Sequence, residues 1–317
     1  MSVLQPEVNI TAGLQYQGSQ EKALVGVLCT GTSCSFLYIN SVLLFTLRSK
    51  PVFCETSRYI LLYNLLFADT AHMVTNVLLF LLAALKIIIA YIPCCVLVLL
   101  SGFTDIISPL TLAVMSVERY VAVCHPLRHS AIFTTRSTGT AIALVWAYNF
   151  IYILVQVFML LYVLTKIYID LHLYDFCSKE AIFSAPIFTK FQQTYHVTVF
   201  FAASVTIMVS YIGVAIVAKS ASTDRASARK ALQTLLLHLI QLSLILTSTF
   251  FTTIIAAYAT VGRLTLIRVY NVCFVCLNIL PRCLSALIYG IKDQNIRPVF
   301  MKYLFCQGRS SVILNKK

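Results

Sequence analysis

Long apolar runs alternate along this chain with short polar connections. Each run exceeds the ~20 residues that an α-helix needs to cross the hydrocarbon of a bilayer. A helix satisfies its own backbone hydrogen bonds in lipid, and the two-residue alternation of a lipid-facing barrel is not visible. The pattern therefore predicts an all-α membrane protein built as a seven-transmembrane helix bundle. The predicted spans are roughly 23–47, 57–84, 90–117, 138–164, 193–218, 231–259 and 266–289.

A different periodicity follows the last apolar run. Apolar side chains recur there on one face of a helix, while Arg297 and Lys302 lie outside that stripe. Such a stripe is typical of a helix that lies along a membrane surface, and Pro298 falls in its first turn, where a missing N–H is tolerated. We therefore expect a short amphipathic eighth helix. Its stripe consists of Ile296, Val299, Phe300, Tyr303 and Leu304.

The composition agrees with lipid as the solvent of most of the chain. Charged residues make up 11% of it and hydrophobic residues 59%, whereas a soluble domain needs a charged exterior. The net charge of +13 could by itself suggest nucleic acid. However, the basic residues are scattered through the connections and form no single patch. We expect membrane lipid around the bundle and no nucleic-acid partner.

The basic residues also predict the orientation. Of the 24 Lys and Arg, 16 lie in connections on one side, seven on the other, and Arg282 lies inside a span. The positive-inside rule then gives an extracellular N-terminus over 1–22, a bundle over 23–289 and a cytoplasmic tail over 290–317. Residues 1–22 lack the order of a cleavable signal peptide. Asn9, in the only Asn-x-Ser/Thr sequon, would be glycosylated on the extracellular side.

Five ionisable residues lie inside or at the end of predicted spans, where each costs roughly 3 kcal/mol. They are Asp69, Asp105, Glu118, Arg119 and Arg282. Asp69 and Arg282 fall at similar depths in the second and seventh spans. We hypothesise that these two pair across the bundle, because unpaired charge in a membrane is costly. The alternative is that Arg282 extends to the membrane surface.

Two cysteines are expected on the extracellular side, where conditions are oxidising. Cys94 begins the third span, and Cys177 is the sole cysteine in the connection 165–190. A disulfide between them is favoured over two free thiols, although the adjacent Cys95 is a second possible partner. No Cys-x-x-Cys pair is combined with histidines at metal-binding spacing, so no metal site is expected.

Three stretches resemble the signatures of one receptor family. MSVERYVAVCHPL (115–127) is similar to the MAYDRYVAIC motif of odorant receptors, which is followed shortly by Pro-Leu. KALQTLLLHL (230–239) resembles the KAFSTC-x-SHL motif that opens their sixth helix. LPRCLSALIYG (280–290) resembles the PPxxNPxIYG element of their seventh helix, in wording most like the fish receptors. Further residues that match are Asn40, Leu65 to Asp69, Ser210 and Tyr211.

Two departures from these motifs stand out. Glu118 replaces the usual Asp, and Ser285-Ala286 stands where rhodopsin-like receptors carry Asn-Pro. The loss of Asn-Pro affects the expected switch geometry of the seventh helix more than the fold.

The resemblance implies a rhodopsin-like (class A) G-protein-coupled receptor of the plasma membrane, without a cofactor. Such a receptor binds a small-molecule odorant among the outer halves of its helices. It then activates a heterotrimeric G protein of the olfactory stimulatory type, which raises cyclic AMP. The resemblance places the switch residues at Asp69, Glu118, Arg119, Tyr120, Tyr211 and Tyr289. It places the ligand pocket at Ser101, Thr104, Asp105, Tyr195, His196, Val199, Phe250, Thr253, Asn271 and Asn278.

Each of these pocket residues could instead serve helix packing or hydrogen bonding between helices. Asp105 is the most informative, because a buried acid favours a cationic or strongly donating ligand. Ser101 stands where amine receptors carry their Asp, so the resemblance does not imply a simple amine agonist. His72 and His196 could titrate near neutral pH, but the sequence names no partner for them.

Other classes of protein are less consistent with the sequence. A secondary transporter would also place charges at mid-membrane, but we find neither two similar halves nor paired broken helices. A channel would need a repeated filter or pore motif. Enzymatic activity is not expected, since Ser, His and Asp are dispersed and no phosphate-binding loop follows a strand. A non-olfactory receptor of the same superfamily remains the stronger alternative.

Overall fold

The computed structural model describes most of the first five predicted spans and parts of the last two. The described residues are 19–85, 87–167, 177–183, 185–220, 229, 231–240, 242–244, 282, 286, 289–291, 293 and 295–305. They are helical or lie in short connections, and no strand occurs in these ranges.

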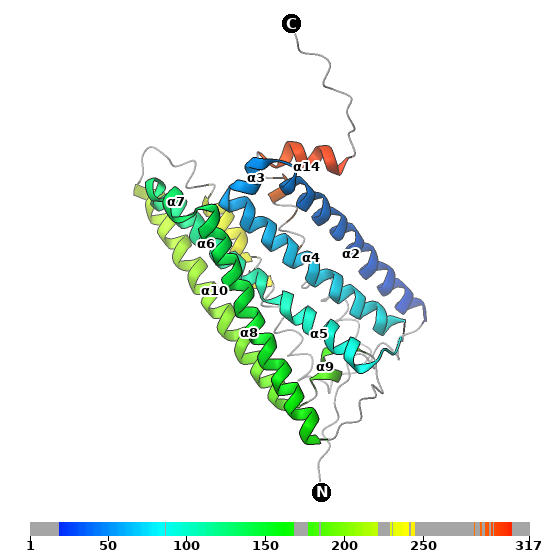
Figure 1. Cartoon of the computed structure of the whole chain (residues 1–317). Helices are drawn as coiled ribbons and strands as arrows, with labels where there is room; N and C mark the ends of the chain where they lie inside the picture. Colours follow the sequence, from blue (N-terminus) through cyan, green and yellow to red (C-terminus); the bar gives the residue numbers. More distant parts are fainter. Residues whose placement is uncertain are drawn as a thin grey trace.

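Long helices run side by side through the described part of the chain (Figure 1). Five helical segments there are long and apolar enough to cross a membrane, and α5 and α6 together form one of them. A shorter apolar helix covers Ala231–Leu244. The long helices are α2 (Ser19–Arg48), α4 (Ser57–Ala84), α5 (Tyr91–Asp105), α6 (Ile107–Cys124), α8 (Thr135–Ile167) and α10 (Pro186–Ser220).

Short helices mark the two ends of the bundle. Figure 1 shows α3 (Pro51–Glu55), α7 (Pro126–Ile132) and α14 (Arg297–Leu304) at one end, which we call the Arg119 end. The helix α9 (Lys179–Ile182) lies at the opposite end, which we call the Cys94 end.

The helix bounds follow the predicted spans with extensions. The helix α4 covers the predicted 57–84, whereas α10 begins at Pro186, seven residues before the predicted 193. Lys190 and Gln192 end the apolar run there, but they do not end the helix, because helical hydrogen bonding does not require apolar side chains. In the same way α6 continues past the predicted 117 to Cys124.

The third span is interrupted at Ile106, between α5 and α6. Pro109 explains the break, because proline has no N–H to donate to the carbonyl of Asp105 four residues earlier. The backbone resumes at once, with the Leu110 N–H donating to the Ile106 carbonyl at 3.4 Å. The interruption falls directly after the only acidic residue of α5, Asp105.

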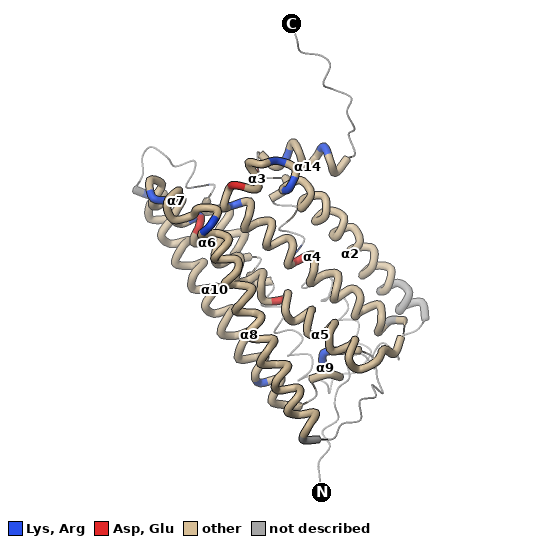
Figure 2. Tube along the Cα trace, viewed as in Figure 1, with Lys and Arg blue, Asp and Glu red and all other residues tan. Residues whose placement is uncertain are grey.

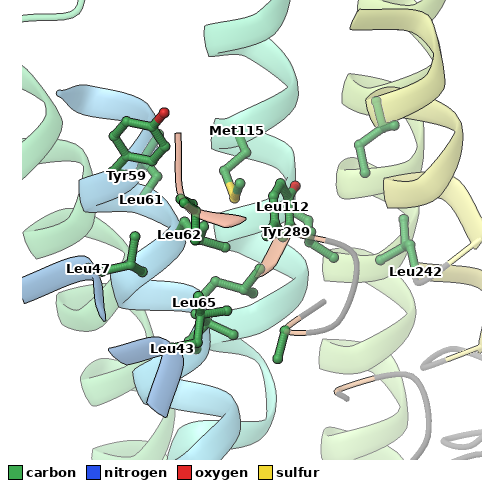
Figure 3. Packing of buried hydrophobic residues seen from close by; sticks show 14 of the residues in the cluster. Leu43, Leu47, Tyr59, Leu61, Leu62, Leu65, Leu112, Met115, Leu242 and Tyr289 are labelled. Atoms are coloured by element: carbon green, nitrogen blue, oxygen red, sulfur yellow. The ribbon is translucent and has the colours of Figure 1, made fainter. Parts of the chain in front are cut away.

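An apolar core joins the helices in the half of the bundle nearer the Arg119 end. Leu43 and Leu65 of α2 and α4 are fully buried there, as is Leu112 of α6. Figure 3 shows these leucines around Tyr289, with Leu242 on the far side of it. The core therefore holds the last residues of the seventh predicted span against the second and third.

The predicted amphipathic helix is present as α14. Phe300 and Ile296 are fully buried, whereas Arg297 and Lys302 are exposed. The helix packs on α2, where the Tyr38 hydroxyl donates to a carbonyl of α14 at 3.3 Å. Part of its apolar stripe therefore packs against the other helices of the protein.

Gly290 is the one place where α14 needs a residue without a side chain. A Cβ added at Gly290 would lie 2.8 Å from Cε1 of the buried Phe300 ring. We predict that Gly290→Ala destabilises the protein by about 1–3 kcal/mol, because the ring must leave its packed position. The measurement is thermal unfolding of purified protein.

A matched glycine provides the control for this substitution. At Gly102 an added Cβ meets only Ile153, at 3.8 Å, which is ordinary contact. Gly102→Ala should therefore leave the unfolding temperature nearly unchanged. Equal effects of the two substitutions would contradict the packing of Phe300 on Gly290.

Candidate functional site

Arg282 joins three spans near the middle of the bundle. Its Nη1 lies 2.9 Å from Asp69 Oδ1 on α4, and its Nη2 lies 2.6 Å from Asp105 Oδ1 on α5. Figure 2 shows the two acidic positions midway along α4 and at the end of α5. The side chain of Arg282 is only 3% exposed, so it does not reach a membrane surface. The predicted pairing of Asp69 with Arg282 is confirmed.

Ser108 completes the contact with Asp69. Its hydroxyl donates to Asp69 Oδ1 at 2.5 Å and accepts from Arg282 Nη1 at 3.3 Å. Asp69 is fully buried, and no described residue donates to its Oδ2. Ser108 was not among the predicted site residues, although it follows Asp105 by three residues and so lies near it along the third span.

The two carboxylates outnumber the permanent cations of the cluster. Arg282 supplies one positive charge to Asp69 and Asp105, and the described surroundings add only His72 and His196. Asp105 keeps 25% of its side-chain surface exposed, in contrast to the fully buried Asp69. Asp105 is therefore the more accessible of the two carboxylates.

Two histidines flank Asp105 from opposite helices. His72 Nε2 on α4 lies 3.5 Å from Asp105 Oδ1, and His196 Nε2 on α10 lies 3.6 Å from Asp105 Oδ2. Both rings are largely buried. The partner that the sequence could not name for these histidines is thus Asp105.

The other predicted pocket residues fall into two groups. The Ser101 hydroxyl donates to Asn76 Oδ1 at 3.1 Å, and the buried Thr104 hydroxyl lies 3.3 Å from His72 Nδ1. Both therefore lie beside the cluster and support it. Val199 is instead buried in the apolar core.

Tyr195 of α10 packs against α8. Its ring stacks on Tyr152 with centroids 3.7 Å apart, and its hydroxyl donates to Asn149 at 3.4 Å. Packing between helices accounts for these contacts. Four predicted pocket residues lie outside the described residues: Phe250, Thr253, Asn271 and Asn278.

A disulfide at the Cys94 end holds α5 to the connection before α10. Cys94 is bonded to Cys177, and the neighbouring Cys95 is a buried free cysteine. The structure therefore selects Cys94 from the two partners that the sequence allowed. Cys177 lies two residues before α9, so the bond fixes this short helix near the first turn of α5.

The Arg119 end carries a second charged group. Arg119 Nε lies 2.8 Å from Glu118 Oε2, and His129 Nε2 of α7 lies 3.1 Å from Glu118 Oε1. Glu118 is buried, so it holds Arg119 and α7 together from within. The Glu118 that replaces the usual Asp can thus still pair with its neighbouring Arg.

Three tyrosines named as switch residues also lie towards this end. The Tyr289 hydroxyl is hydrogen-bonded to His238 Nε2, which joins the seventh predicted span to the sixth. The Tyr120 ring packs so closely on Gly213 of α10 that an added Cβ there would lie 2.4 Å from the ring. Tyr211 packs in the same apolar cluster as Tyr120.

A charged joint that was not predicted from the sequence lies before α14. Arg58 Nη2 lies 2.9 Å from Asp293 Oδ2, and Asp293 Oδ1 accepts from the N–H groups of Asn295 and Ile296 at 2.9 and 3.3 Å. The joint ties the start of α4 to the chain that leads into α14. An Asp two and three residues before those N–H groups is a turn signal that could have indicated it.

Comparison with known proteins identifies the family. The model of the seven-transmembrane receptor family of the rhodopsin type matches residues 39–289. The chain belongs to this family. Membership confirms the predicted fold class and shows that the receptor is not an enzyme. It also rules out the transporter and channel alternatives.

Relatives place the receptor in the olfactory branch of the family. It is 30% identical to Odorant receptor 131-2 of zebrafish (Danio rerio) over 301 residues, which cover 94% of this chain and 88% of that protein. It is 26% identical to human Olfactory receptor 11H4 over 278 residues, covering 84% and 82% of the two chains. The predicted family is therefore confirmed.

Proposed function

We propose that this receptor binds a small-molecule odorant between the Cys94 end and Asp105, and that binding activates a heterotrimeric G protein at the Arg119 end. The G protein would be the olfactory stimulatory type, which raises cyclic AMP. The Cys94 end would face the outside of the plasma membrane and the Arg119 end the cytoplasm. The names of the relatives and the excess of Lys and Arg at the Arg119 end support this proposal.

One observation carries the proposal more than the others. A single span, interrupted at Ile106, begins at the disulfide, passes the charged cluster at Asp105 and ends at Glu118-Arg119. Asp105 and Arg119 are 14 residues apart, or about 21 Å of helix. A ligand that alters the contacts of Asp105 would therefore act on the same span that carries Arg119.

Activation in this scheme is a shift between two populations. The ligand stabilises the arrangement in which it makes the better contacts, and the G protein stabilises the same arrangement from the other end. In the arrangement described here Arg119 is held by Glu118, and Tyr120 is packed on Gly213. Release of these contacts would free the Arg119 end for the G protein.

Neutralising Glu118 should raise ligand-independent signalling. Glu118→Gln removes the charge that holds Arg119 and His129, so the resting arrangement loses stability relative to the active one. We expect basal cyclic AMP, at equal surface level, to rise on the order of 5-fold. Glu55→Gln, on the exposed short helix α3, is the matched control and should leave basal cyclic AMP unchanged. Equal basal signals in the two variants would contradict the role given to Glu118.

A cell-based screen tests the proposed function itself. Cells that display the receptor and contain the olfactory G protein are exposed to water-soluble odorants, including amines, amino acids and bile acids, and cyclic AMP is recorded. The proposal predicts a dose-dependent rise for at least one compound, absent from cells without the receptor. A flat response across the panel with confirmed surface receptor would count against it.

A further inference from the structure

An exposed aromatic pair lies where α14 packs on α2. The Phe45 ring of α2 and the Tyr303 ring of α14 meet edge to face, with their centroids 5.0 Å apart. Phe45 is 60% exposed, although it belongs to an apolar span that ends at Arg48. An apolar ring on the outside of a membrane span faces hydrocarbon, and tyrosine is typical of the boundary between hydrocarbon and headgroups. The pair therefore places α14 at that boundary.

Two cations lie beside this aromatic pair. Arg48 follows Phe45 by three residues and so lies one helical turn further along nearly the same face of α2. Lys302 directly precedes Tyr303 in α14. Both cations are exposed. The contact between the two rings thus brings Arg48 and Lys302 to the same edge of the first span.

Two further cations flank this pair. Lys50 follows Arg48 by two residues, and Arg297 is the first residue of α14. Arg297 and Lys302 are five residues apart, or about 7.5 Å of helix. Figure 2 shows Lys and Arg positions on α14 and at the neighbouring end of α2. We call Arg48, Lys50, Arg297 and Lys302 the α2–α14 basic patch.

Nearby carboxylates leave this patch with an excess of positive charge. None of its four cations forms an ion pair with another described residue. Residues 294–317 contain no Asp or Glu, so α14 and the chain after it supply no acidic side chain. Asp293, just before α14, is held by Arg58 at 2.9 Å. In the described chain around the patch this leaves Glu55 on α3 against four cations.

We propose that the α2–α14 basic patch binds the headgroup of an anionic phospholipid, whose acyl chain lies against Phe45 and Tyr303. Each Lys or Arg near an anionic membrane surface strengthens binding about 5-fold. The exposed rings favour a lipid over a soluble anion, because only a lipid contacts the cations and the rings together. The bound lipid stabilises the packing of α14 on α2 from the membrane side.

Photo-crosslinking locates this lipid without a G protein or an odorant. The full-length receptor is reconstituted in phosphatidylcholine nanodiscs that contain a trace of a phosphatidylserine or a phosphatidylcholine probe. Each probe carries a diazirine in the acyl chain near the headgroup. Digestion and mass spectrometry then measure the labelled peptides. We expect the phosphatidylserine probe to label the end of α2 and α14 about 10-fold more than the phosphatidylcholine probe.

Paired substitutions show whether the patch itself is responsible. Arg48→Ala combined with Lys302→Ala should lower phosphatidylserine labelling of α2 and α14 on the order of 10-fold. Arg48→Lys combined with Lys302→Arg keeps both charges and should retain the labelling. The matched control is Arg128→Ala combined with Arg136→Ala, which removes two exposed cations of α7 and α8 at the same end of the bundle. This control should leave the labelling of α2 and α14 unchanged.

Thermal unfolding in phosphatidylcholine nanodiscs checks that each variant is folded. An equal loss of labelling in the two alanine pairs would overturn the proposal, because the effect would then come from the total charge of this end. Equal labelling by the two probes would also overturn it. If an excess of soluble glycerophosphoserine abolished the labelling, the patch would be a site for soluble anions and not for lipid. Each of these results leaves the proposed odorant response untouched.

Discussion

Replacing Arg282 by methionine is expected to remove most of the receptor from the cell surface. The change leaves Asp69 and Asp105 buried together without a permanent cation. Breaking a buried ion pair from one side costs about 3–5 kcal/mol, which is a large share of the ~5–15 kcal/mol that stabilises a folded protein. Surface labelling of an epitope on the intact receptor measures the loss.

A second substitution should restore part of this loss. Asp69→Asn removes one of the two carboxylates that Arg282 holds, so the double variant with Arg282→Met carries less unpaired charge than the single one. We therefore expect the double variant to reach the surface better than Arg282→Met alone. If its loss equals the sum of both single losses, the pairing is not contributing.

The disulfide gives the second large effect. Cys94→Ser and Cys177→Ser each open a bond between residues 83 positions apart, which should cost about 2–5 kcal/mol. We expect both variants to be retained inside the cell or to unfold at a clearly lower temperature than the unchanged receptor. Thermal unfolding of the purified variants and their surface level are the measurements.

Cys95 provides a matched control for this prediction. It adjoins Cys94 in the first turn of α5 and is also buried, but it carries no disulfide. Cys95→Ser should therefore fold and reach the surface much like the unchanged receptor. A loss at Cys95 as large as that at Cys94 would show that burial in this turn, and not the bond, determines the effect.

The fold was predictable from the sequence because lipid imposes a strong constraint. Uninterrupted apolar runs of the required length have few other interpretations, and the spans they predict agree with α2, α4, α8 and α10 apart from their ends. The ends were less predictable, since a helix can continue through polar residues such as Lys190 beyond the apolar run. The interruption at Ile106 could have been expected from Pro109.

The charged cluster was predictable only in part. The depths of Asp69 and Arg282 suggested their pairing, because an unpaired charge there is costly. The sequence could not show that Arg282 also holds Asp105, since that depends on how the second, third and seventh spans are rotated. The approach of His72 and His196 to Asp105 likewise depends on the rotation of the second, third and fifth spans, which only a structure can place.

The most direct test of the account uses purified components. The receptor, reconstituted in lipid with the olfactory stimulatory G protein, is assayed for nucleotide exchange with and without a compound that was active in the cell screen. We predict that the compound accelerates exchange with the unchanged receptor and has no effect when Arg119 is replaced by alanine. An exchange rate that is the same with and without the compound would contradict a ligand-driven receptor. An exchange rate that is equally fast with Arg119→Ala would contradict activation of the G protein through the Arg119 end.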